Sequence, residues 1–192
     1  MEKIANEIHP LIRERRSTRS FLDKQVDDET LGLLFEAARW SASSMNAQPW
    51  RFVVSLAQDA KYRSLMEESL NEANRSWASS APVLIAVIAE MQHGESGRPN
   101  HHAWYDCGQA VANLILQAQS ADLHARQMGG FNKQVLKENI SIPDGFEPVV
   151  VIALGYKGSP ESLENPAYQA AETSERKRKK TEEIVFTGKW PA

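Results

Sequence analysis

The sequence has 192 residues, of which 42% are hydrophobic and 24% charged, and its formal net charge is −3. This length suits one well-buried domain and is short for two. A pI near 6.0 argues against a nucleic-acid binder, because such proteins usually carry a basic surplus. The one cysteine, Cys107, excludes an internal disulfide and a cysteine-based metal site, and it fits a reducing compartment.

The apolar segments indicate neither a secretory signal nor a membrane span. Residues 1–7 contain acidic side chains and no apolar core, unlike a secretory signal. The longest apolar run, 83–89, is far too short to cross a bilayer. We therefore expect a single cytoplasmic domain over residues 1–192, with no membrane or nucleic-acid partner.

The first predicted elements are two helices. Pro10 can open a short helix that continues toward Arg16. Asp27 or Asp28 can cap a second helix that runs through Trp40. Apolar residues at helical spacing support this second helix.

Strands and further helices are predicted over the next sixty residues. A loop of small and amide side chains at 41–49 leads into 50–56, whose apolar, β-branched composition is typical of a strand. One or two helices with a polar surface are expected at 58–79. The run 83–89 is predicted as a strand buried on both faces, and 91–100 as a loop containing Gly and Pro.

The second half begins with the most apolar helix candidate, 103–121. Its wide face of small apolar residues predicts burial on more than one side. Residues 127–131 are predicted as a turn before a short helix near 133–139, and 149–156 as a third buried strand. Residues 159–192 hold prolines, a basic run and a short apolar tail without a core of their own. Helices that separate the strands indicate an α+β or α/β class.

Two basic clusters stand out in this mildly acidic chain. Residues 13–19 contain four arginines and two hydroxyl side chains, and guanidinium groups bind phosphate and carboxylate well. The run 176–180 is also basic, but acidic residues flank it and no aromatic side chains interleave for base stacking. The residues alone leave open whether these clusters are solvated surface or two sides of one anion site.

Other kinds of site find little support in the sequence. His101 and His102 are adjacent and cannot share one helix face, and the other histidines are scattered, so no metal site is expected. Cys107 on an apolar helix fits a core thiol better than a nucleophile. The sequence contains no Gly-x-Ser-x-Gly, Gly-x-Gly-x-x-Gly or Walker A motif.

Five motifs, in sequence order, resemble those of the nitroreductase family of FMN-dependent NAD(P)H oxidoreductases. One such motif would be weak evidence, whereas five in the right order are strong. Two positions depart from the family pattern, because Ala42 stands where a proline is common and 122–124 replaces a Gly-Leu-Gly turn. The five motifs are Arg15-Arg16-Ser17-Thr18-Arg19-Ser20-Phe21, Ala38 to Trp50, Asp106 to Leu114, Met128-Gly129-Gly130-Phe131, and Arg178 to Val185.

The resemblance implies an α+β fold, a nitroreductase-like α/β sandwich with a central, mostly antiparallel sheet flanked by helices, in an intertwined homodimer. Helix 103–121 would form the dimer core, and 159–192 a C-terminal arm over the partner subunit. The implied activity is ping-pong hydride transfer from NADH or NADPH, via flavin N5, to an electron-poor acceptor such as a nitroaromatic or quinone. The alternatives are a narrow-specificity flavin reductase or dehydrogenase for an enone or halogenated aromatic, and a non-catalytic flavin-binding protein.

The resemblance also assigns FMN contacts to residues of this chain. Arg15 would pair with the phosphate, and Arg16 and Ser17 with phosphate, ribityl or ring polar atoms. Arg19 would lie at the pyrimidine edge near N1 and O2, where a cation stabilises the negative charge of reduction. Gly129-Gly130 would run past the dimethylbenzene–N5 side. The remaining implied contacts are Ser43, Ser44, Asn46 and Gln48, which would reach the flavin of the other subunit, and Lys177 and Lys179, which would complete the phosphate site.

Overall fold

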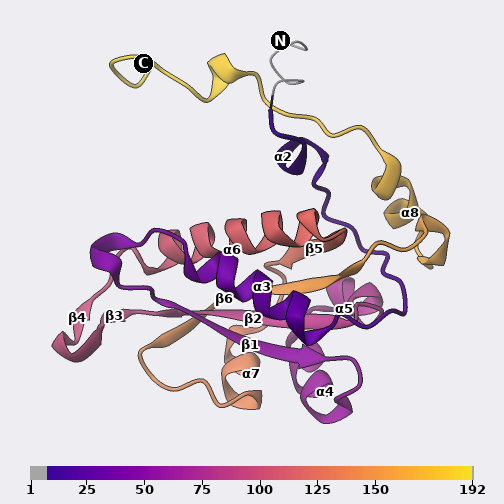
Figure 1. Cartoon of the computed structure of the whole chain (residues 1–192), viewed down its shortest axis with the longest axis horizontal. Helices are drawn as coiled ribbons and strands as arrows, with labels where there is room; N and C mark the ends of the chain where they lie inside the picture. Colours follow the sequence, from indigo (N-terminus) through magenta and orange to yellow (C-terminus); the bar gives the residue numbers. More distant parts are fainter. Residues whose placement is uncertain (1–7, 192) are drawn as a thin grey trace.

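The computed structural model describes residues 8–191; residues 1–7, on which the secretory-signal expectation rests, and residue 192 lie outside it. Four strands form one antiparallel sheet in the order β1-β2-β6-β5 (Figure 1). An antiparallel sheet flanked by helices confirms the predicted α+β class. In that order the strands are β1 (Trp50–Leu56), β2 (Val83–Glu90), β6 (Phe146–Tyr156) and β5 (Leu123–Met128).

Helices cover both faces of the sheet (Figure 1). One face carries α3 (Asp28–Arg39) and α6 (Ala103–Ser120), and the other carries α4 (Ala60–Ser69), α5 (Glu72–Ala78) and α7 (Lys133–Asn139). The terminal segments contribute α2 (Pro10–Glu14) and α8 (Pro166–Thr173). Within residues 8–191, no helix combines the length and apolarity that a membrane crossing requires.

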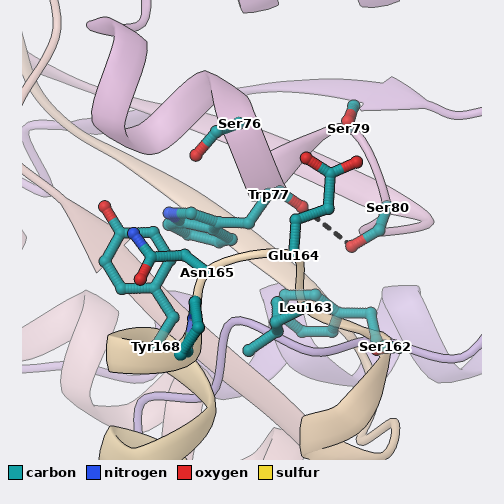
Figure 2. Close-up of a pocket in the computed structure, with 11 residues that line it drawn as sticks. Ser76, Trp77, Ser79, Ser80, Ser162, Leu163, Glu164, Asn165 and Tyr168 are labelled. Atoms are coloured by element: carbon teal, nitrogen blue, oxygen red, sulfur yellow. Dashed lines mark hydrogen bonds between the residues drawn. The ribbon is translucent and has the colours of Figure 1, made fainter.

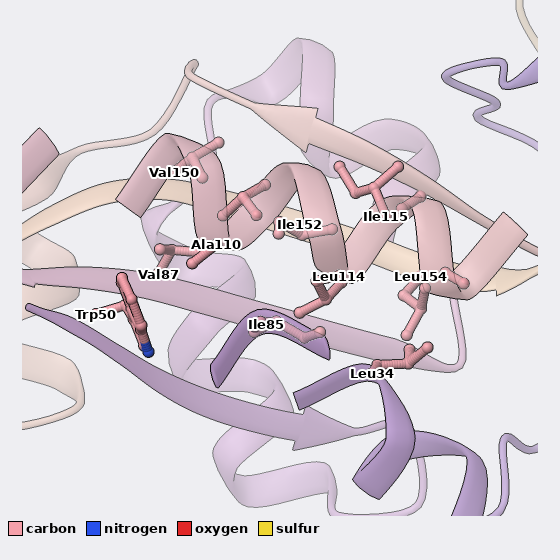
Figure 3. Close-up of a cluster of buried hydrophobic side chains, with 14 of the residues drawn as sticks. Leu34, Trp50, Ile85, Val87, Ala110, Leu114, Ile115, Val150, Ile152 and Leu154 are labelled. Carbon is pink, nitrogen blue, oxygen red and sulfur yellow. The ribbon is translucent and has the colours of Figure 1, made fainter. Parts of the chain in front are cut away.

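The alternation of side chains along β2 explains the two layers of helices. Ile85 and Val87 belong to the core under α3 and α6, whereas Leu84 and Ala86 belong to the core under α4, α5 and α7. Figure 3 shows the first core, where Leu114 of α6 lies over the sheet. All five side chains are fully buried, and burial of a leucine or isoleucine contributes about 1.5–3 kcal/mol.

Strand β5 was not predicted from the sequence. Residues 127–131 were expected to form a turn, but pairing with β6 continues through Met128. The strand contains no β-branched residue, and buried Leu123 and Ala125 alternate with more exposed polar neighbours. It therefore lacks the usual compositional signal of a strand, and the turn begins only at Gly129.

Other boundaries also differ from the predictions. The first helix ends at Glu14 and so includes Arg13 but not Arg15 or Arg16, and the third predicted strand begins at Phe146. The expected loop 91–100 contains a small antiparallel hairpin, whose turn ends at Gly97 with φ +62°, a conformation that favours glycine. The hairpin strands are β3 (Gln92–His93) and β4 (Arg98–Pro99).

Helix α6 is covered on one side within this chain. Ala110, Leu114 and Ala118 are fully buried, whereas Tyr105 is 70% exposed and Ala112 is exposed as well. The described residues therefore do not supply the second covering surface that the composition of this helix predicts.

The C-terminal arm begins on the domain and then leaves it. Leu163 joins the core under α5, and Glu172 of α8 is buried. Beyond α8 the chain is exposed and extends away from the sheet, past α2 (Figure 1). Three apolar side chains near its end, Ile184, Val185 and Trp190, are 62%, 60% and 80% exposed. Their placement over a partner subunit stays a prediction.

Candidate functional site

A buried carboxylate joins the N-terminal segment to the C-terminal arm. Glu172 is 5% exposed, and its two oxygens accept hydrogen bonds from the Thr18 hydroxyl at 2.5 Å and the Arg19 backbone N–H at 2.8 Å. Nearby, the Ser20 hydroxyl donates to the Ser159 carbonyl at 2.6 Å. These bonds fix the backbone of the arginine-rich segment and so determine where its side chains emerge.

Arginines from both ends of the chain meet at this crossing. Arg16 donates to the carbonyls of Glu172 at 3.0 Å and Ser174 at 2.8 Å. Arg176 donates to the Arg15 carbonyl at 2.6 Å and to a second carbonyl in α2. The fold thus brings arginines from segments about 160 residues apart to the border of the same hollow.

The electrostatics of this cluster favour an anion. Burial lowers the pKa of Arg176, and the charges of Arg16, Arg178 and Arg15 lower it further. Two hollows, of about 580 and 220 Å³, border the same four arginines. An anion in either hollow would relieve the repulsion among the cations.

The basic run 176–180 meets the cluster in a register different from the one predicted. Arg176 and Arg178 border both hollows, whereas Lys177 and Lys179 are exposed and lie outside the described linings. The expected alternation along an extended chain is present, but the structure brings the arginines rather than the lysines to the site.

Arg126 of β5 adds a cation that sequence reasoning missed. It donates to the Ser17 carbonyl at 2.6 Å, and burial, followed by the charge of Arg19, lowers its pKa. The guanidinium carbon of Arg19 lies 4.5 Å from the centroid of the Tyr168 ring, a cation–π arrangement. Arg126 could have been found only by recognising β5 as a strand.

The turn Gly129-Gly130 follows β5 and lies against the start of α5. The Gly130 carbonyl accepts hydrogen bonds from the Asn71 backbone N–H and the Asn74 side-chain amide, both at 3.0 Å. A Cβ on Gly130 would lie 2.4 Å from Asn71 Nδ2, so a larger residue here would displace the asparagine side chains. A Cβ on Gly129 would meet no heavy atom within 4 Å, so the space beside it is open. Neither asparagine was among the predicted site residues.

The loop with the other predicted contacts lies elsewhere in the chain. Its backbone is fixed because the Ser44 N–H donates to Asp106 of α6 at 3.0 Å and the Gln48 N–H donates to the Ser43 hydroxyl at 3.0 Å. Asn46 and Gln48 have positive φ values of 55° and 47°. Figure 1 shows this loop at one end of the domain and the segment between α2 and α3 at the other. One copy of the chain therefore does not bring the loop to the arginines.

Cys107 lies in the core, as its sequence context suggests. Burial and the neighbouring Asp106 charge raise the pKa of its thiol to about 12, so the thiolate required of a nucleophile is not formed near neutral pH. Over residues 8–191, no three His, Cys, Asp or Glu side chains are grouped so that they could hold a metal ion.

This chain resembles known proteins in both sequence and fold. The profile described as "Nitroreductase family" matches residues 12–76 and 55–156. A 15.4 kDa protein of unassigned function from Mycolicibacterium smegmatis is 34% identical over 63% of this chain and 80% of its own. An Archaeoglobus fulgidus protein, provisionally named an NADH dehydrogenase/NAD(P)H nitroreductase, is 27% identical over 76% of this chain and 83% of its own. A crystal structure described as an oxidoreductase containing FMN has a TM-score of 0.89 and 32% identity, covering 96% of this chain and 93% of that one.

Proposed function

Since this chain belongs to the nitroreductase family, we propose that it is an FMN-dependent oxidoreductase that transfers hydride from NADH or NADPH to an electron-poor acceptor, such as a nitroaromatic or a quinone. The observation that carries the proposal is the crowded arginine cluster, whose segment is joined through Ser17 to Arg126 on the strand that leads into the open Gly129 turn. The likeness to an FMN-containing oxidoreductase, at 32% identity over 96% of the chain, supports it. When bound, FMN supplies the two-electron chemistry, and the protein supplies orientation and electrostatics.

The arginine cluster fits the phosphate of FMN. The hollow of about 220 Å³ is bordered by Arg15, Arg16, Arg176 and Arg178, and a phosphate monoester carries close to two negative charges at neutral pH. Arg16 already donates to two carbonyls, so it acts mainly through its charge. Arg15, which donates to the Ser17 hydroxyl at 3.1 Å, is suited to turn toward the phosphate.

Arg19 is the proposed electrostatic residue of the reaction. Glu172 fixes its backbone and the Tyr168 ring supports its guanidinium group. Arg126 lies close enough for the two charges to interact. Two-electron reduction places negative charge at the pyrimidine edge of the flavin, and a preorganised cation there stabilises it. The open side of Gly129 leaves room for a ring to approach the backbone.

We further propose a homodimer whose two sites are completed by both copies. The loop with Ser43, Ser44, Asn46 and Gln48 lies far from the arginines of its own chain (Figure 1), so it can serve the site of a second copy. The contact between the two copies can also use the uncovered side of α6. The arm, residues 159–192, offers a second surface through the apolar side chains near its end. A cytoplasmic location stays a prediction that the single cysteine supports.

The colour of the purified protein tests this function. A yellow preparation with flavin absorbance that NADH or NADPH bleaches under anaerobic conditions supports the enzyme. A colourless preparation that cannot be reconstituted with FMN contradicts it. A preparation that binds FMN but is bleached by neither donor would favour the non-catalytic flavin-binding alternative. Steady-state assays across nitroaromatics, quinones, enones and halogenated aromatics then separate a broad acceptor range from a narrow one.

A further inference from the structure

A cavity of about 620 Å³, larger than either of the arginine-lined hollows, lies against Trp77 and Tyr168 (Figure 2). It is formed between the end of α5 and residues 162–168 of the arm. Trp77 and Tyr168 form aromatic parts of its wall, and the guanidinium carbons of Arg126 and Arg19 lie 5.5 and 4.5 Å from the centroids of these rings. Two cations, Arg19 and Arg126, therefore lie against the aromatic side chains of this wall.

The wall contains a buried donor without an acceptor. Trp77 is 3% exposed, and its Nε1–H has no hydrogen-bond partner among the described residues. Figure 2 shows the indole nitrogen at the side of the cavity where Asn165 and Tyr168 lie. A buried N–H without a partner is costly, so an acceptor atom of a ligand in this cavity would be favoured.

The remaining lining selects a hydroxylated ligand. Ser76, Ser79 and Ser80 bring hydroxyl groups to the end of α5. Glu164 is the one charged side chain among the lining residues that the structure describes, and Figure 2 shows its carboxylate extended toward the serines. A carboxylate accepts hydrogen bonds from a sugar diol and repels a phosphate.

We propose that this cavity binds the adenosine half of the nicotinamide donor, with Glu164 accepting hydrogen bonds from the ribose hydroxyls. The assignment rests on the proposed function. The pyrophosphate then lies near Arg19 and Arg126, which contact the aromatic side chains of the cavity wall. Along α5, Asn71 beside Gly130 and Trp77 at the cavity are separated by six residues, roughly 9 Å of helix, which an extended dinucleotide spans. Because Glu164 repels a 2′-phosphate, the donor is NADH rather than NADPH.

Calorimetric titration with ADP-ribose tests the cavity without any electron transfer. The wild-type protein is expected to bind ADP-ribose more tightly than its 2′-phosphate, by about tenfold. Glu164→Gln is expected to weaken ADP-ribose binding by about tenfold, and Glu164→Lys to reverse the preference. Trp77→Phe keeps the ring and removes the N–H, so weaker binding is expected there as well. Asp144→Asn, an exposed carboxylate in the turn before β6, is the matched control and leaves both affinities unchanged.

Anaerobic reduction of the FMN-loaded protein separates this assignment from the proposed function. The donors are NADH, NADPH and 1-benzyl-1,4-dihydronicotinamide, which lacks ribose and adenosine. The Glu164 variants are expected to change the NADH and NADPH dependence and to leave reduction by the benzyl donor unchanged. Bleaching by NADH, together with identical ADP-ribose affinities in the wild type and both Glu164 variants, overturns the cavity assignment and leaves the function standing. Failure of all three donors contradicts the proposed function.

Discussion

Arg19 combines a fixed backbone with a supported guanidinium group, so its charge can be removed without removing the arginines of the proposed phosphate site. Arg19→Ala is expected to lower the reduction potential of bound FMN by about 30 mV, which corresponds to roughly 1.4 kcal/mol for a two-electron couple. The reason is the loss of a cation that stabilises the charge of reduction. Potentiometry with a reference dye measures the shift. Arg39→Ala, on the exposed side of α3, is the control, and equal potentials in the wild type and Arg19→Ala with FMN bound would exclude this role.

The lowered pKa of His124 predicts that stability depends on pH. Burial lowers the pKa of its imidazole, and the Lys157 charge lowers it further, against smaller opposite effects of Asp122 and Glu172. The unfolded chain therefore binds more protons near the ordinary histidine pKa of about 6.5, and stability falls as the pH drops through that value. His124→Gln removes this group and is expected to reduce the loss of unfolding free energy between about pH 7.5 and about pH 5.5. Urea denaturation at both pH values measures it, and an equal loss in both proteins counts against this cause.

At the level of elements, the crossing of the N-terminal segment and the arm depends on a glycine. The Gly158 N–H donates to the Ser20 carbonyl at 2.9 Å. A Cβ on Gly158 would lie 2.5 Å from Ser20 Oγ and 3.0 Å from backbone atoms of Phe21. Gly158→Ala is therefore expected to lower the unfolding free energy by about 1–3 kcal/mol, because the backbone must shift.

A second glycine provides the matched control for that substitution. Gly32 lies inside α3, and a Cβ there would meet nothing within 4 Å. Gly32→Ala is expected to raise the unfolding free energy by about 0.5–1 kcal/mol, because alanine is the better helix former. Urea denaturation of both variants gives opposite signs if the close approach at Gly158 is the cause, and equal signs contradict it.

The sequence predicts an element correctly when the residues of that element, and those next to it, determine its conformation. The bounds of β1 and α7 matched the prediction, because a β-branched run and the glycines that precede a short helix are local features. Strand β5 owes its conformation to pairing with β6, a contact that its composition does not announce.

The same distinction holds for the site. The arginines at 15–19 were found in the sequence, but their partner Glu172 lies more than 150 residues away, and no local pattern links the two. Arg126 was lost together with β5. The turn at Gly129 was recognised, whereas the asparagines that donate to the Gly130 carbonyl were not, since they belong to another helix.

At the scale of the whole molecule, the described chain has its proposed binding groups at two separated ends. The arginine cluster and the Gly129 turn are built from the N-terminal segment, β5 and the arm, whereas the Ser43 to Gln48 loop is fixed by Asp106 of α6. In a dimer with a two-fold axis, every contact between the two copies occurs twice. If the loop of one chain reaches the arginine cluster of the second, the loop of the second chain therefore reaches the cluster of the first. The exposed side of α6 lies on the element that fixes the loop, which places the expected contact along this helix.

The end of the arm tests this assembly. Ile184, Val185 and Trp190 are 62%, 60% and 80% exposed, and burying one such side chain contributes about 1.5–3 kcal/mol. Replacing all three by alanine is expected to raise the dimer dissociation constant by at least about two orders of magnitude, or ~3 kcal/mol. Sedimentation equilibrium of the full-length proteins measures it, with Lys189→Ala as the control on the same exposed segment. A wild-type protein that is monomeric at micromolar concentrations, or an unchanged dissociation constant in the triple variant, would rule out an arm that binds the partner subunit through these residues.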